Sequence, residues 1–311
     1  MNFIGRILIS FSFFALLHVQ TLAQDSSRIS ISELKHIINV LASDSLKGRG
    51  NGTPELRMAG DFINDYFLNI GLQPLPGYNG LRIPFFVSNS ATIKEPLYNI
   101  VGVLPGRSRA NEIVMFTSHY DHVGATGIGK DSIFNGANDN ASGTTAVMLL
   151  AKYFATRNDN ERTLVFCTFA GEELGLIGSR DLAERMNPKE IVALINLEMI
   201  GIRQYGRNQV FITGSRESEL PWILRKQLKK QGIRVIWEDE TQHLFERSDN
   251  YPFALKGVPA HTIMSSDDHD YCYHRPCDQV KRLDLENMRR IVEGVALSVE
   301  GLVDGSLTVK H

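Results

Sequence analysis

Short apolar runs alternate with segments of helical periodicity over most of the chain, and this alternation limits the possible folds more than any other feature. The expected strands are 113–116, 164–169, 191–197 and 258–264, and the expected helices are 142–154, 174–186, 217–231 and 285–302. Strands that alternate with helices form a mainly parallel sheet covered by helices on both faces. We therefore predict an α/β fold with a mainly parallel central sheet.

Two further helices are expected before the first of these strands. Ser30 and Glu33 have the spacing of a capping box, and apolar residues at helical spacing follow them. Thr53 is placed to cap the second helix, with Pro54 in its first turn, and Gly71 is placed to end it. The glycine-rich segment 48–52 between the two helices predicts a turn or loop.

The first 23 residues have the pattern of a secretory signal peptide. Arg6 precedes the apolar run 7–19, and the small-residue stretch that ends at Ala23 follows it. The apolar run is short against the roughly 20 residues that span a bilayer, so we expect cleavage after Ala23 and no membrane anchor afterwards. The rest of the chain, 24–311, is predicted to form one domain of a protein that is exported to a periplasm or secreted.

Charge and cysteine content exclude several classes of protein. The chain has 33 basic and 35 acidic side chains without a long charged run, so a nucleic-acid or anionic-membrane partner is not expected. Three cysteines are too few for a disulfide scaffold. Cys167 lies in an apolar run and is expected to be buried, whereas Cys272 and Cys277 flank His274 and are candidates for a disulfide in an oxidising compartment.

Side chains that bind metals follow three of the expected strands. His119 and Asp121 follow the first strand, Glu172 and Glu173 the second, and Glu198 the third. Because ligands of open α/β sheets bind at the carboxyl ends of the strands, we expect these groups to converge. Taken singly, such residues more often form ion pairs at the surface, stand at the start of a helix or are paired within the core. Their joint placement favours a functional site.

Two more candidates complete a mixed set of nitrogen and oxygen ligands. Asp139 lies in the small-residue loop 136–143, and His274 lies late in the chain. Two histidines with three carboxylates suit zinc, or less tightly cobalt or manganese. Glu172 and Glu173 are adjacent, so one side chain can bind metal while the other faces a metal-bound water. Asp139 is the best candidate to bridge two ions.

These residues lie in motifs that resemble the zinc metallopeptidase family twenty-eight, which includes secreted bacterial leucyl aminopeptidases and glutamate carboxypeptidase. The matching segments are 118–121, 136–143, 169–173, 196–201 and 273–278, with weaker matches at 46–50 and 247–253. The resemblance implies a phosphorylase/hydrolase-like zinc exopeptidase fold and two zinc ions per chain. It assigns one zinc to His119, Asp139 and Glu198, and the other to Asp139, Glu173 and His274.

The same resemblance implies catalytic roles. Glu172 would be the general base, Asp121 would accept a hydrogen bond from His119, and Asp278 would act similarly near His274. The implied activity is that of an aminopeptidase, which hydrolyses the N-terminal bond of peptide substrates through a metal-bound hydroxide. Many members have aspartate where this chain has Glu198, which leaves a carboxypeptidase open. The sequence is also compatible with a glutaminyl-cyclase-like transferase that uses one zinc, and with a metal-free binding protein on the same fold.

Overall fold

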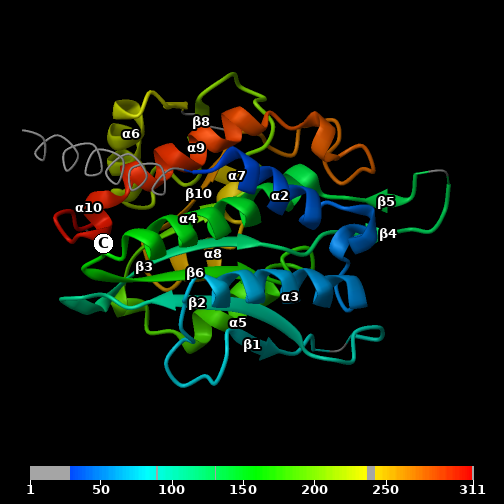
Figure 1. The fold of residues 1–311 in the computed structure, drawn as a ribbon, viewed down its shortest axis with the longest axis horizontal. Coiled ribbons are helices and arrows are strands. Elements are labelled where there is room, and N and C mark those ends of the chain that lie inside the picture. The colour runs from blue at the N-terminus through cyan, green and yellow to red at the C-terminus, as the bar shows by residue number, and fades with distance from the viewer. Residues whose placement is uncertain (1–28, 89, 130, 237–241, 310–311) are drawn as a thin grey trace, which may run out of the picture.

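An eight-stranded sheet crosses the protein in the computed structural model, which describes residues 29–88, 90–129, 131–236 and 242–309 (Figure 1). The predicted signal peptide lies outside the described residues. The strands, in their order across the sheet, are β1 (Arg82–Phe85), β2 (Leu97–Leu104), β6 (Arg162–Phe169), β3 (Arg109–His119), β7 (Ile191–Leu197), β10 (Ala260–Met264), β8 (Gln209–Ile212) and β9 (Arg234–Ile236). Two short strands, β4 (Gly124–Ala125) and β5 (Ile133–Phe134), form a separate ladder.

The centre of the sheet is parallel, as the sequence predicts. Strands β6, β3, β7 and β10 are parallel neighbours. The flanking strands were not predicted: β2 is antiparallel to β6, β1 to β2, and β8 to β10. The fold is therefore α/β with a parallel centre and antiparallel neighbours on both sides.

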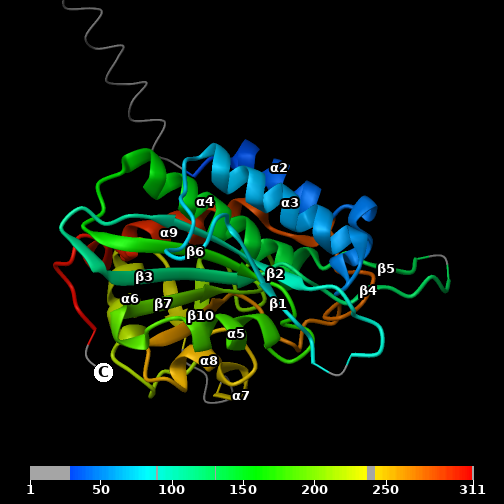
Figure 2. The same ribbon diagram turned by 90° about the horizontal axis from the view of Figure 1, so that it is seen from below.

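Helices cover both faces of this sheet (Figure 2). One face carries α2 (Ile31–Leu41), α3 (Pro54–Asn69), α4 (Gly143–Arg157) and α9 (Leu285–Ser298), and α6 (Leu220–Lys230) packs against α9. The other face carries α5 (Ile177–Arg185) and α8 (Tyr251–Ala254). The remaining helical segments are η1 (Asp44–Arg49), η2 (Ala137–Ser142), η3 (Pro188–Glu190), α7 (Gln242–Phe245), η5 (Val280–Arg282) and α10 (Glu300–Val303). Within the described part of the chain, no helix combines the length and the apolar character needed to cross a membrane.

The central strands are continuously apolar because both of their faces are buried. In β3, Val114 and Phe116 pack with the helices α3, α4 and α9, whereas Met115 packs into the separate core under α5 and α8. All three side chains are fully buried. Burial of apolar surface at roughly 25 cal/mol per Å² makes such a strand stable only between two helical layers.

The caps predicted from the sequence form, and several helix boundaries differ from the expected ones by up to three residues or by a break. Ser30 accepts a hydrogen bond from the Glu33 backbone N–H, and Thr53 accepts one from the Leu56 backbone N–H. The helix expected at 174–186 begins only at Ile177, because Gly175 and Leu176 have left-handed φ angles of 94° and 63°. The helix expected at 285–302 is divided into α9 and α10.

Candidate metal centre and active site

The carboxyl ends of the three central strands bring the predicted polar residues to one edge of the sheet. The parallel register places His119 beside Phe169 and Thr117 beside Asn196, so β3, β6 and β7 end near one another. The loops that follow these strands carry His122, Glu173 and Glu198. This is the edge at which open α/β sheets bind their ligands.

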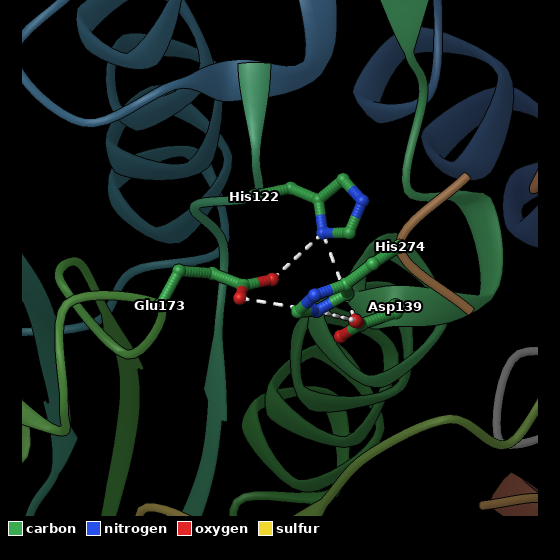
Figure 3. Close-up of side chains that lie close together, drawn as sticks. All are labelled: His122, Asp139, Glu173 and His274. Atoms are coloured by element: carbon green, nitrogen blue, oxygen red, sulfur yellow. Dashed lines mark hydrogen bonds and ion pairs between the residues drawn. The ribbon is translucent and has the colours of Figure 1, made fainter. Parts of the chain in front are cut away.

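Four residues form a compact set of side chains of the types that can bind a metal (Figure 3). They are His122, Asp139, Glu173 and His274, and each offers one ligand atom within 4.8 Å of the others. The Nε2 atom of His274 lies 3.1 Å from Asp139 Oδ2 and 3.1 Å from Glu173 Oε2. Three of the four residues were predicted, and His122 was not.

The loop between β5 and α4 carries Asp139 into this cluster. Gly136 has a φ angle of 56°, and a Cβ atom there would lie 2.5 Å from the His122 ring, so only glycine fits. The Asp278 carboxylate accepts hydrogen bonds from the backbone N–H groups of Asn138 (2.9 Å) and Asp139 (3.0 Å). Asp278 therefore orients the loop that holds Asp139, whereas the family resemblance implied a contact near His274.

Arg49 connects the same loop to the end of β3 through hydrogen bonds. Its guanidinium is buried and donates hydrogen bonds to the backbone carbonyls of Leu41, Tyr120, Asn135 and Gly136 at 2.6 to 2.9 Å. Burial lowers the pKa of Arg49 to about 10, although nearby carboxylates, Asp139 first, oppose that shift. The group stays protonated at neutral pH and places one positive charge behind an acidic cluster.

Asp121 positions its neighbours through its backbone carbonyl and its carboxylate. His119 Nδ1 lies 3.2 Å from the Asp121 backbone carbonyl and 3.7 Å from its carboxylate. That carboxylate accepts hydrogen bonds from Asn51 Nδ2 (2.6 Å) and from the backbone N–H groups of Glu172 (3.3 Å) and Glu173 (3.2 Å). Asp121 therefore also fixes the turn that presents the two glutamates.

Glu172 and Glu173 point in different directions, as expected for neighbours on a turn. Glu173 reaches His122 and His274, whereas Glu172 Oε2 lies 4.0 Å from His119 Nε2. Glu198 follows β7, and its Oε2 accepts a hydrogen bond from Asn196 Nδ2 at 3.3 Å. Among the described residues, Glu198 lies outside the compact four-residue set.

The carboxyl groups around His119 are crowded and buried. Burial raises the pKa of Glu172, and it raises the pKa of Glu198 and of Asp249 to about 7. Asp249, which sequence reasoning did not select, is fully buried, and neither carboxylate oxygen has a hydrogen-bond partner among the described residues. A bound cation would relieve the repulsion among these groups.

Unpartnered buried atoms show that the residues present fit a metal ion. His119 Nε2, Asp139 Oδ2 and His274 Nε2 are buried and have no hydrogen-bond partner in the described residues. These imidazole nitrogens nevertheless face carboxylates at 3.1 to 3.4 Å. Nitrogen and oxygen ligands on a tetrahedral zinc ion lie at similar separations from one another.

His274 is carried by a short loop that a disulfide closes. Cys272 and Cys277 are bonded, with their Cα atoms 5.4 Å apart, which confirms the pairing considered from the sequence. The Tyr273 ring stacks on the His274 ring with the centroids 3.9 Å apart. Cys167 is buried and free, as expected.

His122 is the member of the compact set that was not predicted from the sequence. It comes three residues after His119, so a spacing signal existed. Its side chain is buried, and its Nδ1 lies 2.8 Å from Glu173 Oε1 and 3.7 Å from Asp139 Oδ2. The residues next to His122 in the sequence do not indicate that its side chain contacts Glu173 and Asp139.

Known proteins resemble this chain in sequence and in fold. The aminopeptidase YwaD of Bacillus subtilis (strain 168) is 24% identical over 210 residues, which cover 65% of this chain and only 44% of that relative. The Legionella pneumophila LapA aminopeptidase shares the fold, with a TM-score of 0.69 at 18% identity over 98% of this chain and 78% of its own. Porphyromonas gingivalis glutaminyl cyclase also shares it, with a TM-score of 0.69 at 17% identity over 88% of this chain and 99% of its own.

A family model matches more than half of the chain. The model described as Peptidase family M28 matches residues 99–299. That range contains the central strands of the sheet, both histidines of the predicted ligand set and all of its carboxylates. The chain therefore belongs to peptidase family M28.

Proposed function

We propose that this protein is a zinc aminopeptidase that hydrolyses the N-terminal peptide bond of peptides. The observation that carries the proposal is the cluster of Asp139, Glu173 and His274 at the carboxyl ends of the central strands, with Glu172 beside it. The names of the Bacillus and Legionella proteins support the same activity. We assign one zinc to Asp139, Glu173 and His274, and a second to His119, Asp139 and Glu198.

Glu172 has the position and the environment of a general base. It is outside the compact ligand set, its side chain is 13% exposed, and burial raises its pKa towards the range in which it can both accept and return a proton. Zinc at this site would lower the pKa of a water molecule and polarise the scissile carbonyl. Glu172 would take the proton from that water and deliver it to the leaving amine.

A glutaminyl-cyclase activity is the second candidate, because one specific observation favours it. The four ligand atoms of His122, Asp139, Glu173 and His274 form one compact set, and Glu198 lies outside it. One set of this size suits one ion. The likeness to Porphyromonas gingivalis glutaminyl cyclase shows a shared fold and is compatible with either activity.

Metal content measured together with substrate turnover distinguishes the two candidates. We expect two zinc ions per chain, hydrolysis of peptides and anilides with a free N-terminus, and no cleavage of N-blocked peptides. A chelator should abolish turnover and zinc should restore it. One zinc per chain with conversion of N-terminal glutamine to pyroglutamate would replace the aminopeptidase by the cyclase, and cleavage of N-blocked substrates only would indicate a carboxypeptidase.

We also propose that the protein is exported, with a signal peptide that ends at Ala23. The support is the sequence pattern of residues 1–23 and the disulfide between Cys272 and Cys277, because disulfides persist in oxidising compartments. Mass spectrometry of protein purified from its native cells should find Gln24 as the first residue. An intact N-terminus that retains Met1 would contradict export by cleavage.

A further inference from the structure

His122 contacts the metal cluster without having the geometry of a metal ligand. Its Nδ1 is 2.8 Å from Glu173 Oε1, which is a hydrogen-bond distance. Zinc ligands at about 2.0 to 2.2 Å in a tetrahedral arrangement lie roughly 3.3 Å from one another. His274 Nε2 lies 3.1 Å from Asp139 Oδ2 and from Glu173 Oε2, close to that value, and meets neither in hydrogen-bond geometry, whereas His122 Nδ1 meets Glu173 Oε1 in that geometry.

The other nitrogen of His122 supports the same distinction. A histidine that binds metal almost always donates its second N–H to a partner. His122 Nε2 is buried and has no hydrogen-bond partner among the described residues. A proton on Nδ1 satisfies the Glu173 contact and leaves Nε2 as an unprotonated nitrogen that needs no acceptor.

The protein holds the His122 ring in one orientation. The His122 backbone N–H donates to the Arg49 carbonyl at 3.2 Å, and the ring lies against Gly136, where a Cβ atom would approach it to 2.5 Å. The ring also makes an edge-to-face contact with the His274 ring, with centroids 5.4 Å apart and planes at 76° (Figure 3). The Nδ1 atom therefore has a fixed direction toward Glu173.

We propose that His122 is a positioning residue that donates its Nδ1 proton to Glu173 Oε1 and so leaves only Glu173 Oε2 free to bind the metal. The inference rests on the zinc site of the proposed function. With Oε1 occupied by this hydrogen bond, Glu173 would offer a metal only Oε2, and the protein would supply one ligand atom fewer than a bidentate carboxylate would. A catalytic zinc site requires a coordination position that the protein leaves open.

Two substitutions of His122 separate positioning from ligation. The amide of His122→Asn places an N–H near the position of Nδ1 but is a poor zinc ligand, whereas His122→Ala supplies neither group. Zinc affinity, measured by competition with a chelating dye, should stay within about threefold of the wild-type value in His122→Asn and fall about 10- to 100-fold in His122→Ala. The exposed His36→Ala variant serves as the matched control and should not change the affinity.

Cobalt substitution gives a readout that does not depend on turnover. The visible absorption of the Co²⁺-loaded His122→Asn variant should match that of the wild type, because the ligands are unchanged. Equal loss of zinc affinity in both variants with an altered cobalt spectrum would overturn the proposal in favour of ligation. Unchanged zinc affinity in His122→Ala would overturn it as well. Thermal melting of the metal-free variants reports folding separately, and a protein that binds zinc but cleaves no peptide would contradict the proposed function alone.

Discussion

Glu172→Gln should retain the zinc content of the wild type and lose about 10²- to 10⁴-fold in kcat, the contribution typical of a general acid–base residue. The side chain keeps its size but loses its capacity to accept a proton. Glu172 lies outside the compact ligand set, and Asp121 holds its backbone N–H at 3.3 Å independently of the side chain. The geometry of the site should therefore survive the substitution.

The neighbouring residue provides the matched control for this experiment. Glu173→Gln removes a carboxylate that faces both His122 and His274, so it should lower zinc content and activity together. Zinc per chain and steady-state turnover, measured on the same preparations, separate the two variants. Wild-type turnover in Glu172→Gln, or loss of its zinc, would contradict the role assigned to Glu172.

Arg49→Met should destabilise the metal-free protein by about 3 kcal/mol or more, because the substitution removes the guanidinium donor from four buried backbone carbonyls, of which that of Gly136 still accepts the Ala141 backbone N–H at 3.1 Å. Methionine fills a similar volume, so the loss reports hydrogen bonds and charge instead of a cavity. Arg49→Lys retains the charge but has a compact ammonium in place of the planar guanidinium, so it should recover only part of the stability.

The free energy of unfolding of these variants is best measured by urea denaturation in the presence of a chelator. Arg57→Met is the control, because Arg57 is exposed on the adjacent helix α3, and it should change stability by less than about 0.5 kcal/mol. An Arg49→Met variant as stable as the Arg57→Met control would show that other groups or water satisfy the four carbonyls.

The parts of the fold that the sequence predicts are those in which local pattern and burial agree. Strands β3, β6 and β7 are long apolar runs between two helical layers, and their parallel pairing places their carboxyl ends at the shared edge where the predicted ligands meet. Strand β1 was not predicted because only two of its four residues are buried and because it contains Pro84, a residue that argues against a strand. In β2, Asn99 is a polar residue in a fully buried position, where it bonds to the distant Gly178 carbonyl.

In the site, too, the residues that could be predicted are those with a local sequence signal. Asp139, Glu173 and His274 were predictable because strand ends, a small-residue loop and the family motifs identify them. The spacing of His122 from His119 was a local signal, but the role of His122 depends on Glu173, which is remote in sequence, so the spacing alone does not assign that role. The Arg49 contacts join four separate stretches of backbone, and only the folded chain brings these carbonyls together.

The zinc ion that we propose at Asp139, Glu173 and His274 would also act as a cross-link between distant parts of the polypeptide. Its ligands follow different strands, and the unfolded chain would have to close long loops to bring them together. Zinc would therefore bind the native state preferentially, and we expect free zinc at about 1,000 times its Kd to add ~4 kcal/mol to the stability of the fold. The measured free energy of unfolding of any variant would then depend on the free zinc concentration as well as on the substitution.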